Sequence, residues 1–307
     1  MNSNRIPRVS VGLPVYNGEP FLVQALEVLL SQTFTDFELI ICDNASTDGT
    51  EAICRGYAAR DPRVRYLRHA RNIGVTRNFN HCVAEARAPY FRWAASDDLC
   101  APTLLEKLVA VLDARPDVVL AYPGTREIDE RGDTVRDYSD GLGLEQEAPH
   151  QRFSACLWKV YWCNPLFGLF RTEVLRRTGL FVNYSNSDIV LLCEVPLHGK
   201  LVEVPETLFH RRVHSGMTVR KYRTAHERMA MGNPELAGRL TFPNTRFFAG
   251  FFAAIRRSGL PWRERMLCYA RLHICWRRWR ERCPASSLEW AASPRTGPGF
   301  LACWRDF

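Results

Sequence analysis

Short apolar segments alternate with helical segments over the first 122 residues, and this alternation is the strongest constraint on the fold. The apolar segments have strand length and span residues 8–15, 37–42, 64–68 and 118–122, with one more beginning at Pro89. Segments with helical spacing or capping signals stand between them. Such alternation predicts βαβ units and a parallel sheet covered by helices on both faces.

Polar residues follow three of these predicted strands at the point where each strand ends. They are Tyr16-Asn17, Asp43 and the pair Asp97-Asp98. Right-handed crossovers bring the loops after parallel strands to one edge of the sheet, where open α/β folds bind ligands. Two adjacent carboxylates are typical of a site for Mg²⁺ or Mn²⁺ on a substrate diphosphate. The alternative is that Ser96-Asp97-Asp98 only caps the helix that follows Pro102.

The pattern is less regular after Thr125. We expect a mobile loop over the charged, glycine-rich residues 127–144. Further on, Ser187 is a candidate cap for an apolar helix. The remaining expected elements are helices at 153–161, 172–178 and 189–197, and strands at 165–170, 200–204 and 207–213, the last two joined by a Pro-Glu turn.

Positive charge is concentrated late in the chain. Residues 256–283 contain nine Arg and two Glu, which accounts for seven of the eight net positive charges. Trp and Arg interleave on predicted helices within residues 242–283, which favours contact with an anionic membrane surface. The alternative is that these helices pack on the rest of the protein with solvated Arg side chains. Nucleic-acid binding is not expected, because no motif for it accompanies the charge.

The cysteines and the hydropathy of the chain indicate in which cellular compartment the protein is expected. The eleven Cys include no Cys-x-x-Cys pair, as expected for free thiols in a reducing cytoplasm. No run of about 18 apolar residues is present, and the first residues do not have the pattern of a signal peptide. We therefore expect a cytoplasmic protein, with peripheral attachment to the inner face of the cell membrane as an option.

Six motifs occur together in an order that resembles glycosyltransferase family 2. They are VGLPVYNGE at 11–19, DNASTDGT at 43–50, RNIGVTRN at 71–78, SDD at 96–98, NSD at 186–188 and RVH at 212–214. The resemblance covers roughly residues 8–216. It implies an inverting transferase that moves a sugar from a nucleotide-diphosphate donor, with UDP as the first expectation, to a hydroxyl of a glycan or lipid-linked acceptor.

The resemblance also implies a fold and a division of the chain. We expect a GT-A, Rossmann-like α/β fold with a mostly parallel central sheet flanked by helices and a C-terminal helical extension. The transferase domain would be residues 1–218, with a nucleotide-binding part at about 8–123 and an acceptor part at about 124–218. A basic helical extension would follow at 219–283. Residues 284–307 contain Pro, Ser and Gly without a period and are expected to be poorly ordered.

Site residues are carried over from the family's motifs. Asp188 would be the general base, while Asp98 and His214 would hold a divalent metal, Mg or Mn. The residues implied to contact the nucleotide sugar are Pro14, Tyr16, Asn17, Glu19, Asp43, Arg77 and Asp97. Within this group Asp43 would accept a hydrogen bond from the base, and Arg77 would lie near the base or diphosphate.

Some of these residues have an alternative explanation, and the chain differs from the family's pattern at one position of the expected metal site. Asp188 could instead only favour the dipole of the following helix, and His214 could be a loop histidine. Many relatives carry an acidic residue where this chain has Ala95, so the metal site has one carboxylate fewer. Two other functions remain open: a nucleotidyltransferase that makes sugar nucleotides, and a non-catalytic sugar-nucleotide or membrane-binding module.

Overall fold

A nine-stranded mixed sheet forms the centre of the computed structural model, which describes residues 5–184, 186–216, 225–236 and 243–282. Its strand order is β3-β2-β1-β4-β8-β6-β9-β5, with β7 paired to β6. The strands are β1 (Val9–Val15), β2 (Phe37–Asp43), β3 (Val64–Arg68), β4 (Tyr90–Trp93), β5 (Leu99–Cys100), β6 (Val118–Ile128), β7 (Thr134–Tyr138), β8 (Leu169–Arg171) and β9 (Lys200–Arg212).

The parallel core of the sheet matches the predicted βαβ units. Strand β1 pairs parallel with β2 and β4, β2 pairs parallel with β3, and β6 pairs parallel with β9. Every residue of β1 and β2 is buried, as expected for continuous apolar runs in a sheet covered on both faces. The short strands β5, β7 and β8 pair antiparallel, so the expectation of a mostly parallel sheet is confirmed.

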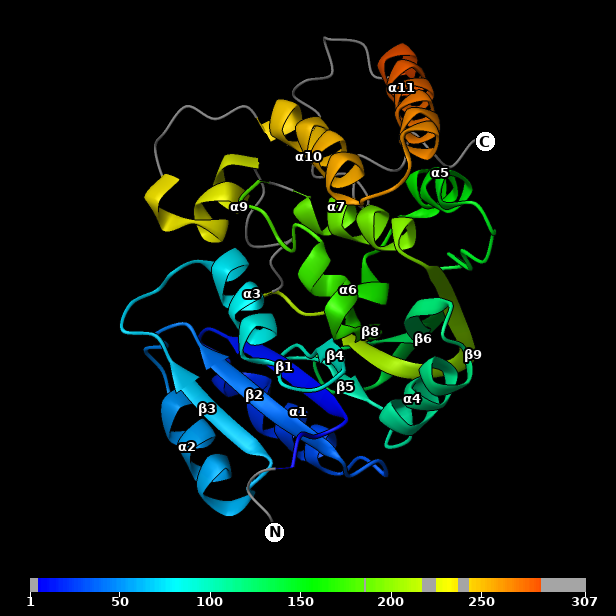
Figure 1. The fold of residues 1–307 in the computed structure, drawn as a ribbon. Coiled ribbons are helices and arrows are strands. Elements are labelled where there is room, and N and C mark those ends of the chain that lie inside the picture. The colour runs from blue at the N-terminus through cyan, green and yellow to red at the C-terminus, as the bar shows by residue number, and fades with distance from the viewer. Residues whose placement is uncertain (1–4, 185, 217–224, 237–242, 283–307) are drawn as a thin grey trace.

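Helices cover both faces of the sheet (Figure 1). One face packs against α1 (Glu19–Leu30), α2 (Thr50–Arg60) and α4 (Leu104–Ala114). The other face packs against α3 (Val75–Glu85), α5 (Pro149–Lys159), α6 (Thr172–Arg177) and α7 (Ser187–Glu194). The remaining described helices are η1 (Asn164–Phe167), η2 (Val195–Leu197), α9 (Ala225–Gly232), η3 (Pro234–Leu236), α10 (Pro243–Arg257) and α11 (Trp262–Arg282).

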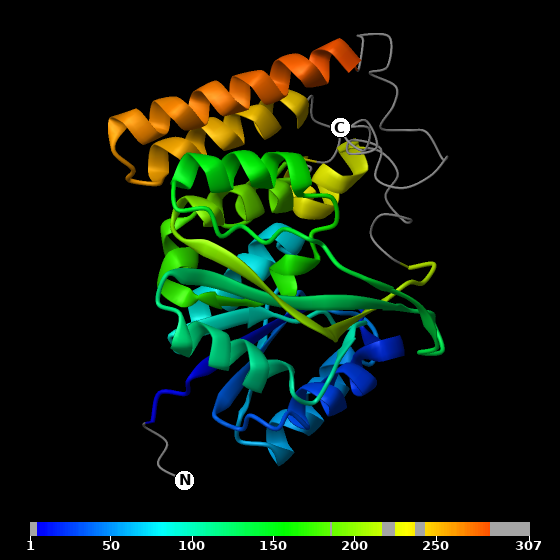
Figure 2. The same ribbon diagram turned by 90° about the vertical axis from the view of Figure 1, so that its right-hand side faces the viewer.

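Helices α10 and α11 form a further layer on top of α5 and α7 (Figure 2). Phe247 and Phe251 of α10, together with Leu272 of α11, are buried in the same core as α5 and α7. An ion pair between Arg257 and the buried Glu194, with N–O distances of 2.8 and 2.9 Å, joins α10 to α7. The predicted disordered segment 284–307 lies outside the described residues.

Four local predictions are wrong. Residues 127–144 are not one mobile loop, because β6 continues to Ile128 and pairs with β7. Cross-strand ion pairs Arg126–Asp137 and Arg136–Glu127 join β6 to the exposed strand β7 of this hairpin, so opposite charges of this segment face each other across the two strands. Residues 200–204 and 207–213 are not two strands joined by a turn. They belong to the single strand β9, whose register with β6 shifts near Pro123 and Gly124.

The third correction concerns the start of α7. Asn186, not Ser187, occupies the N-cap position and adopts a left-handed backbone conformation with φ of 65°. Asn tolerates this region better than most residues, because its short polar side chain can form hydrogen bonds with the nearby backbone. Ser187 is therefore the first residue of α7, and Asp188 lies in its first turn. Residues 165–170, predicted as a strand, divide into η1 and β8.

Candidate active site

A cleft of about 1260 Å³ opens at the carboxyl ends of β1, β4 and β9. Parallel strands all present these ends to one edge of the sheet, so residues distant in sequence meet there. Of the predicted site residues, those that line the cleft are Pro14, Tyr16, Asn17, Asp97, Asp98, Asp188 and His214. The carboxylate pair and Asp188 therefore face one shared space, although 90 residues separate Asp98 from Asp188 in the sequence.

Asp43 lies beneath the cleft and does not line it. Its Oδ1 accepts a hydrogen bond from the backbone N–H of Ser46 at 2.9 Å, and its Oδ2 accepts one from the Tyr66 hydroxyl at 2.7 Å. The Arg68 guanidinium lies 3.3 Å from the same Oδ2. Burial and the Asp43 charge raise the pKa of Tyr66, which therefore remains a donor. Asp43 therefore connects the loop after β2, through Ser46, to Tyr66 and Arg68 of β3.

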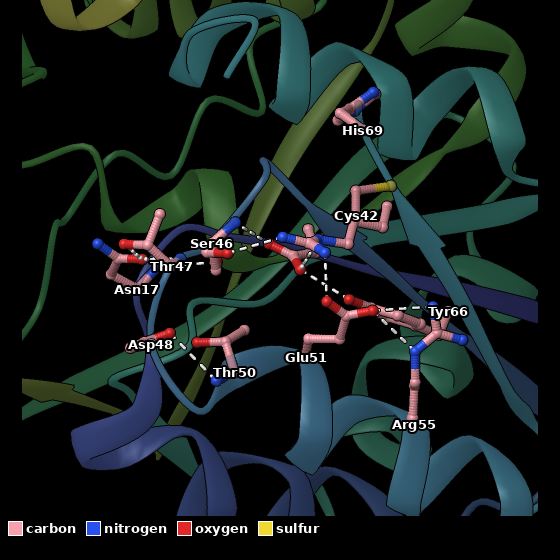
Figure 3. Close-up of polar contacts among 12 residues, drawn as sticks. Asn17, Cys42, Ser46, Thr47, Asp48, Thr50, Glu51, Arg55, Tyr66 and His69 are labelled. Carbon is pink, nitrogen blue, oxygen red and sulfur yellow. Dashed lines mark hydrogen bonds and ion pairs between the residues drawn. The ribbon is translucent and has the colours of Figure 1, made fainter. Parts of the chain in front are cut away.

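Asn17 and Glu19 join the loop after β1 to the loop after β2. The Asn17 Oδ1 accepts a hydrogen bond from the backbone N–H of Thr47 at 2.8 Å, as Figure 3 shows. Glu19 accepts one from the backbone N–H of Gly49 at 2.8 Å and does not line the cleft. Asn17 adopts a positive φ of 53°, which these contacts stabilise. Both residues therefore shape the rim on which Tyr16 is presented.

Arg77 lies on the exposed side of α3, outside the cleft lining. Its guanidinium is 3.7 Å from Glu235 of η3, and the side chain is half exposed. Asn72 and Asn78 line the cleft in the same region. The Asn72 Oδ1 accepts a hydrogen bond from Asn44, a further lining residue, at 3.0 Å. These asparagines were not predicted from the sequence as site residues, although Asn72 and Asn78 stand within the motif at 71–78.

The last residues of β9 hold the Asp97-Asp98 pair. The backbone N–H of Arg212 donates to Asp98 Oδ1 at 2.8 Å, and its Nε donates to the Asp97 carbonyl at 2.9 Å. Burial and the neighbouring Asp97 charge raise the pKa of Asp98, while Arg211 and Arg212 partly oppose this rise. A protonated or cation-bound Asp98 is favoured over a bare carboxylate, because two adjacent negative charges repel each other.

His214 contacts Asp97 through one ring nitrogen. Its Nε2 lies 2.9 Å from Asp97 Oδ2, and its Nδ1 accepts a hydrogen bond from the backbone N–H of Gly216 at 3.2 Å. This pair of contacts assigns the ring proton to Nε2, which donates to Asp97. An edge contact with Phe21, with ring centroids 5.0 Å apart, fixes the ring further. In this structure the ring orients Asp97, and the metal ligation by His214 that the family's motif implies stays an untested prediction, which would require the ring to leave one of these partners.

The side chains around Asp97 and Asp98 decide whether the predicted metal fits this cleft. Within the described ranges, no three His, Cys, Asp or Glu side chains are grouped closely enough to hold an ion by themselves. Asp97 and Asp98 nevertheless supply the hard oxygen ligands that Mg²⁺ and Mn²⁺ prefer. Mg²⁺ commonly binds one or two carboxylates and completes its shell with water and substrate phosphates. The pair therefore fits a cation that is shared with a diphosphate.

Asp188 faces the cleft from the first turn of α7. Its Oδ1 accepts a hydrogen bond from the backbone N–H of Ile189 at 2.9 Å. Cys163, which also lines the cleft, lies beside this carboxylate. Burial and the charges of Asp188 and Asp140 raise the pKa of the Cys163 thiol, so the thiol stays protonated and can donate to Asp188. Cys163 was not identified from the sequence, where it is one of many isolated cysteines.

The fold and the comparison with known families define the class of protein. The fold is that of the GT-A glycosyltransferases, as comparison with solved structures shows. The family model described as glycosyl transferase family 2 matches residues 10–178, more than half of the chain. The chain therefore belongs to glycosyltransferase family 2.

Curated relatives match less than half of the chain. EpsE of Bacillus subtilis (strain 168) is 38% identical over 133 residues, which cover 43% of this chain and 47% of that protein. Chondroitin synthase of Escherichia coli is 36% identical over 133 residues, covering 43% of this chain and 19% of that protein. The match thus spans less than half the length of either relative.

Solved structures match over nearly the whole chain at low identity. The structure of S. aureus TarS 1-349 in complex with UDP-GlcNAc has a TM-score of 0.66 at 14% identity, covering 96% of this chain and 79% of that chain. The mannosyltransferase PcManGT from Pyrobaculum calidifontis, in complex with GDP-Man and Mn²⁺, has a TM-score of 0.53 at 17% identity, covering 90% and 87%. These similarities establish the fold.

Proposed function

We propose that the protein transfers a sugar from a nucleoside-diphosphate donor, with UDP as the first choice, to a hydroxyl of a glycan or lipid-linked acceptor. The observation that carries this proposal is the shared cleft of Asp98 and Asp188. Asp98 suits a cation that binds the leaving diphosphate, and Asp188 suits the incoming hydroxyl as a proton acceptor. The relatives in solved structures that bind UDP-GlcNAc and GDP-Man support a nucleotide sugar as the donor.

The chemistry is a single displacement with inversion. Asp188 accepts the proton of the acceptor hydroxyl, whose oxygen forms a bond to the anomeric carbon of the sugar. The bond from that carbon to the diphosphate oxygen breaks, and its electron pair remains on the diphosphate. A divalent cation bound at Asp97-Asp98 would supply Lewis-acid stabilisation of that leaving group. Asp98 would be its principal ligand, while His214 keeps Asp97 oriented.

The two substrates are proposed to bind to different parts of the chain. We assign nucleotide binding to about residues 8–123 and acceptor binding to about 124–218. The predicted extension at 219–283 contains α9, α10 and α11, while its residues 219–224, 237–242 and 283 lie outside the described part of the chain. Pro14, Tyr16 and Asn17 line the part of the cleft where the base would bind. Contact of the base with Asp43, and of the donor with Glu19 or Arg77, requires these side chains to exchange their present partners.

Thermal unfolding in the presence of nucleoside diphosphates tests the proposal. UDP with Mn²⁺ should raise the Tm of the wild-type protein more than UDP alone, and Asp98→Asn should lose the metal-dependent part. Asp133→Asn is a matched control, because Asp133 is exposed in the hairpin. An equal metal-dependent shift in Asp98→Asn would remove Asp98 from the metal site.

Product analysis separates this function from its two alternatives. Incubation with a panel of sugar nucleotides should release the nucleoside diphosphate. Release of pyrophosphate from a nucleoside triphosphate and a sugar phosphate would instead identify a nucleotidyltransferase. Donor binding without turnover over a broad acceptor panel, equal in wild type and Asp188→Asn, would identify a binding module.

The outer surface of α10 and α11 supports peripheral contact with an anionic membrane. Its exposed apolar side chains are Phe252, Trp262, Met266, Leu267 and Ile274, and Arg256, Arg263 and Arg271 are exposed among them. Such a mixture suits the interface of a bilayer with anionic lipids. None of the described helices is long and apolar enough to span a membrane. A location at the cytoplasmic face of the membrane stays a prediction.

Sedimentation with lipid vesicles tests the membrane contact. The wild-type protein should bind vesicles that contain phosphatidylglycerol and not those of pure phosphatidylcholine, and Trp262→Ser with Met266→Ser should weaken this binding. Val135→Ser serves as the control, since Val135 is an exposed apolar residue on the hairpin. Equal sedimentation of all variants with both vesicle types would contradict the proposal.

A further inference from the structure

An aromatic and cationic pair lines the cleft on the side of Asp188, and the donor contacts described above do not use it. The Arg211 guanidinium carbon lies 4.7 Å from the centroid of the Trp162 ring, within the range of a cation–π contact. Tyr161 packs edge-on against Trp162, with ring centroids 5.3 Å apart. All three residues line the cleft and are partly exposed in it.

Arg211 differs from its neighbour Arg212 in its partners. Arg212 is buried, and its guanidinium donates to the carbonyls of Asp97, Asp129 and Glu130 and to Gln24. The Arg211 side chain makes no hydrogen bond or ion pair with any other residue in the part of the chain that the structure describes. Its guanidinium is therefore held against an indole ring while its N–H donors face the cleft, an arrangement suited to a carboxylate or phosphate.

Trp162 and Arg211 lie on the side of the cleft where the acceptor would bind. Trp162 directly precedes Cys163, the residue that lies beside the Asp188 carboxylate. A sugar ring against Trp162 would thus present its hydroxyls near the proposed general base. Aromatic rings suit this task because the C–H face of a sugar is apolar and an indole offers a large flat surface.

We propose that Trp162 and Arg211 form the acceptor subsite, and that the acceptor carries an acidic group, a carboxylate or a phosphate, on or next to the sugar that accepts the transfer. The inference rests on the proposed function, since it names the substrate class of that same cleft. Trp162 contacts the sugar face, and Arg211 donates two parallel hydrogen bonds to the acidic group. An acceptor hydroxyl is then oriented toward Asp188.

The competing role for Arg211 is contact with the diphosphate of the donor. Arg211 is close enough to Asp98 to lower the pKa of that carboxyl, so its charge is also felt at the donor end of the cleft. The two roles predict different losses on substitution. If Arg211 contacts the acceptor, its substitution leaves UDP binding unchanged. If Arg211 contacts the diphosphate, its substitution weakens UDP binding.

Saturation-transfer NMR with matched sugars distinguishes the two roles. Methyl β-glucoside, methyl β-glucuronide and glucose 6-phosphate are titrated onto the wild-type protein with and without saturating UDP and Mg²⁺. We expect the two acidic probes to bind about tenfold more tightly than the neutral one, the gain from hydrogen bonds to a charged group. Arg211→Gln should abolish this preference, and Trp162→Leu should weaken all three probes. Arg131→Gln, which removes one exposed arginine, is the control for charge.

Each result has a distinct meaning. Equal affinity of the wild-type protein for neutral and acidic probes overturns the inference. A loss of UDP stabilisation in Arg211→Gln assigns Arg211 to the donor and also overturns it. Failure of UDP to stabilise the wild-type protein counts instead against the proposed function. Thermal unfolding of each variant checks the fold, and Trp162→Phe replaces Trp162→Leu if the latter does not fold, with a smaller loss expected.

Discussion

His214 Nε2 lies 2.9 Å from Asp97 Oδ2, and this contact joins the loop after β9 to the end of β4 across 117 positions of the sequence. Arg212, at the C-terminal end of β9, donates two further hydrogen bonds to the carboxylate pair, so this end of β9 holds Asp97 and Asp98 in place. The site is therefore assembled by the pairing of β6 with β9 as much as by the strands that precede the carboxylates.

The first prediction concerns His214 as a donor to Asp97. His214→Phe removes the hydrogen bond and should lower kcat/KM by about tenfold, the effect of one hydrogen bond to a charged group. His214→Gln keeps a donor and should retain most of the activity. Because both ring nitrogens already have partners, the Mn²⁺ concentration for half-maximal activity should stay the same in both variants. A large rise in that concentration would instead identify His214 as a metal ligand.

The second prediction concerns the buried Arg212. Arg212→Met leaves the carbonyls of Asp97, Asp129 and Glu130 without this donor, and it should lower the free energy of unfolding by about 3 kcal/mol or more. Arg126→Met is the control, since Arg126 pairs with the exposed Asp137 and its loss should cost much less stability than that of Arg212. Denaturant unfolding measures both values, and similar losses would contradict the assignment.

The third prediction concerns the pH dependence of stability at Asp140. Burial raises the pKa of Asp140 to about 8, although Asn164 and Arg211 partly oppose this rise. The folded state therefore binds the Asp140 proton more tightly than the unfolded chain, whose Asp has a pKa of about 3.9. The resulting stabilisation is complete below the unfolded pKa and is lost as the pH rises through the folded pKa.

Asp140→Asn removes this titration while keeping the shape of the side chain. The Tm of the variant relative to wild type should therefore increase from pH 5 to pH 9, by about 2–4 °C for each kcal/mol regained. Asp133→Asn should show no such trend, because Asp133 is exposed. A Tm difference for Asp140→Asn that stays constant over this pH range would contradict the assigned shift.

Much of the fold was predictable because buried parallel strands are continuous apolar runs that differ from their helical neighbours. The meeting of Asp98 with Asp188 followed from the family's motifs. The hairpin of β6 and β7 was not predictable, since its charges pair across strands and not along the chain. The burial of Asp43 depends on the fold of the loop after β2. The contact of Trp162 with Arg211 depends on the register of β9, which no local pattern encodes.

The most direct test of the account is the turnover of Asp188→Asn with a nucleotide sugar and acceptor that the wild-type protein uses. The release of nucleoside diphosphate should fall by about 10²–10⁴-fold, the usual contribution of a general base, while the Tm shift with UDP and Mn²⁺ stays at the wild-type value. Glu173→Gln, at an exposed position in the first turn of α6, should keep full activity. Full activity of Asp188→Asn, or a loss that follows reduced UDP binding, would contradict the assignment of Asp188 as the base.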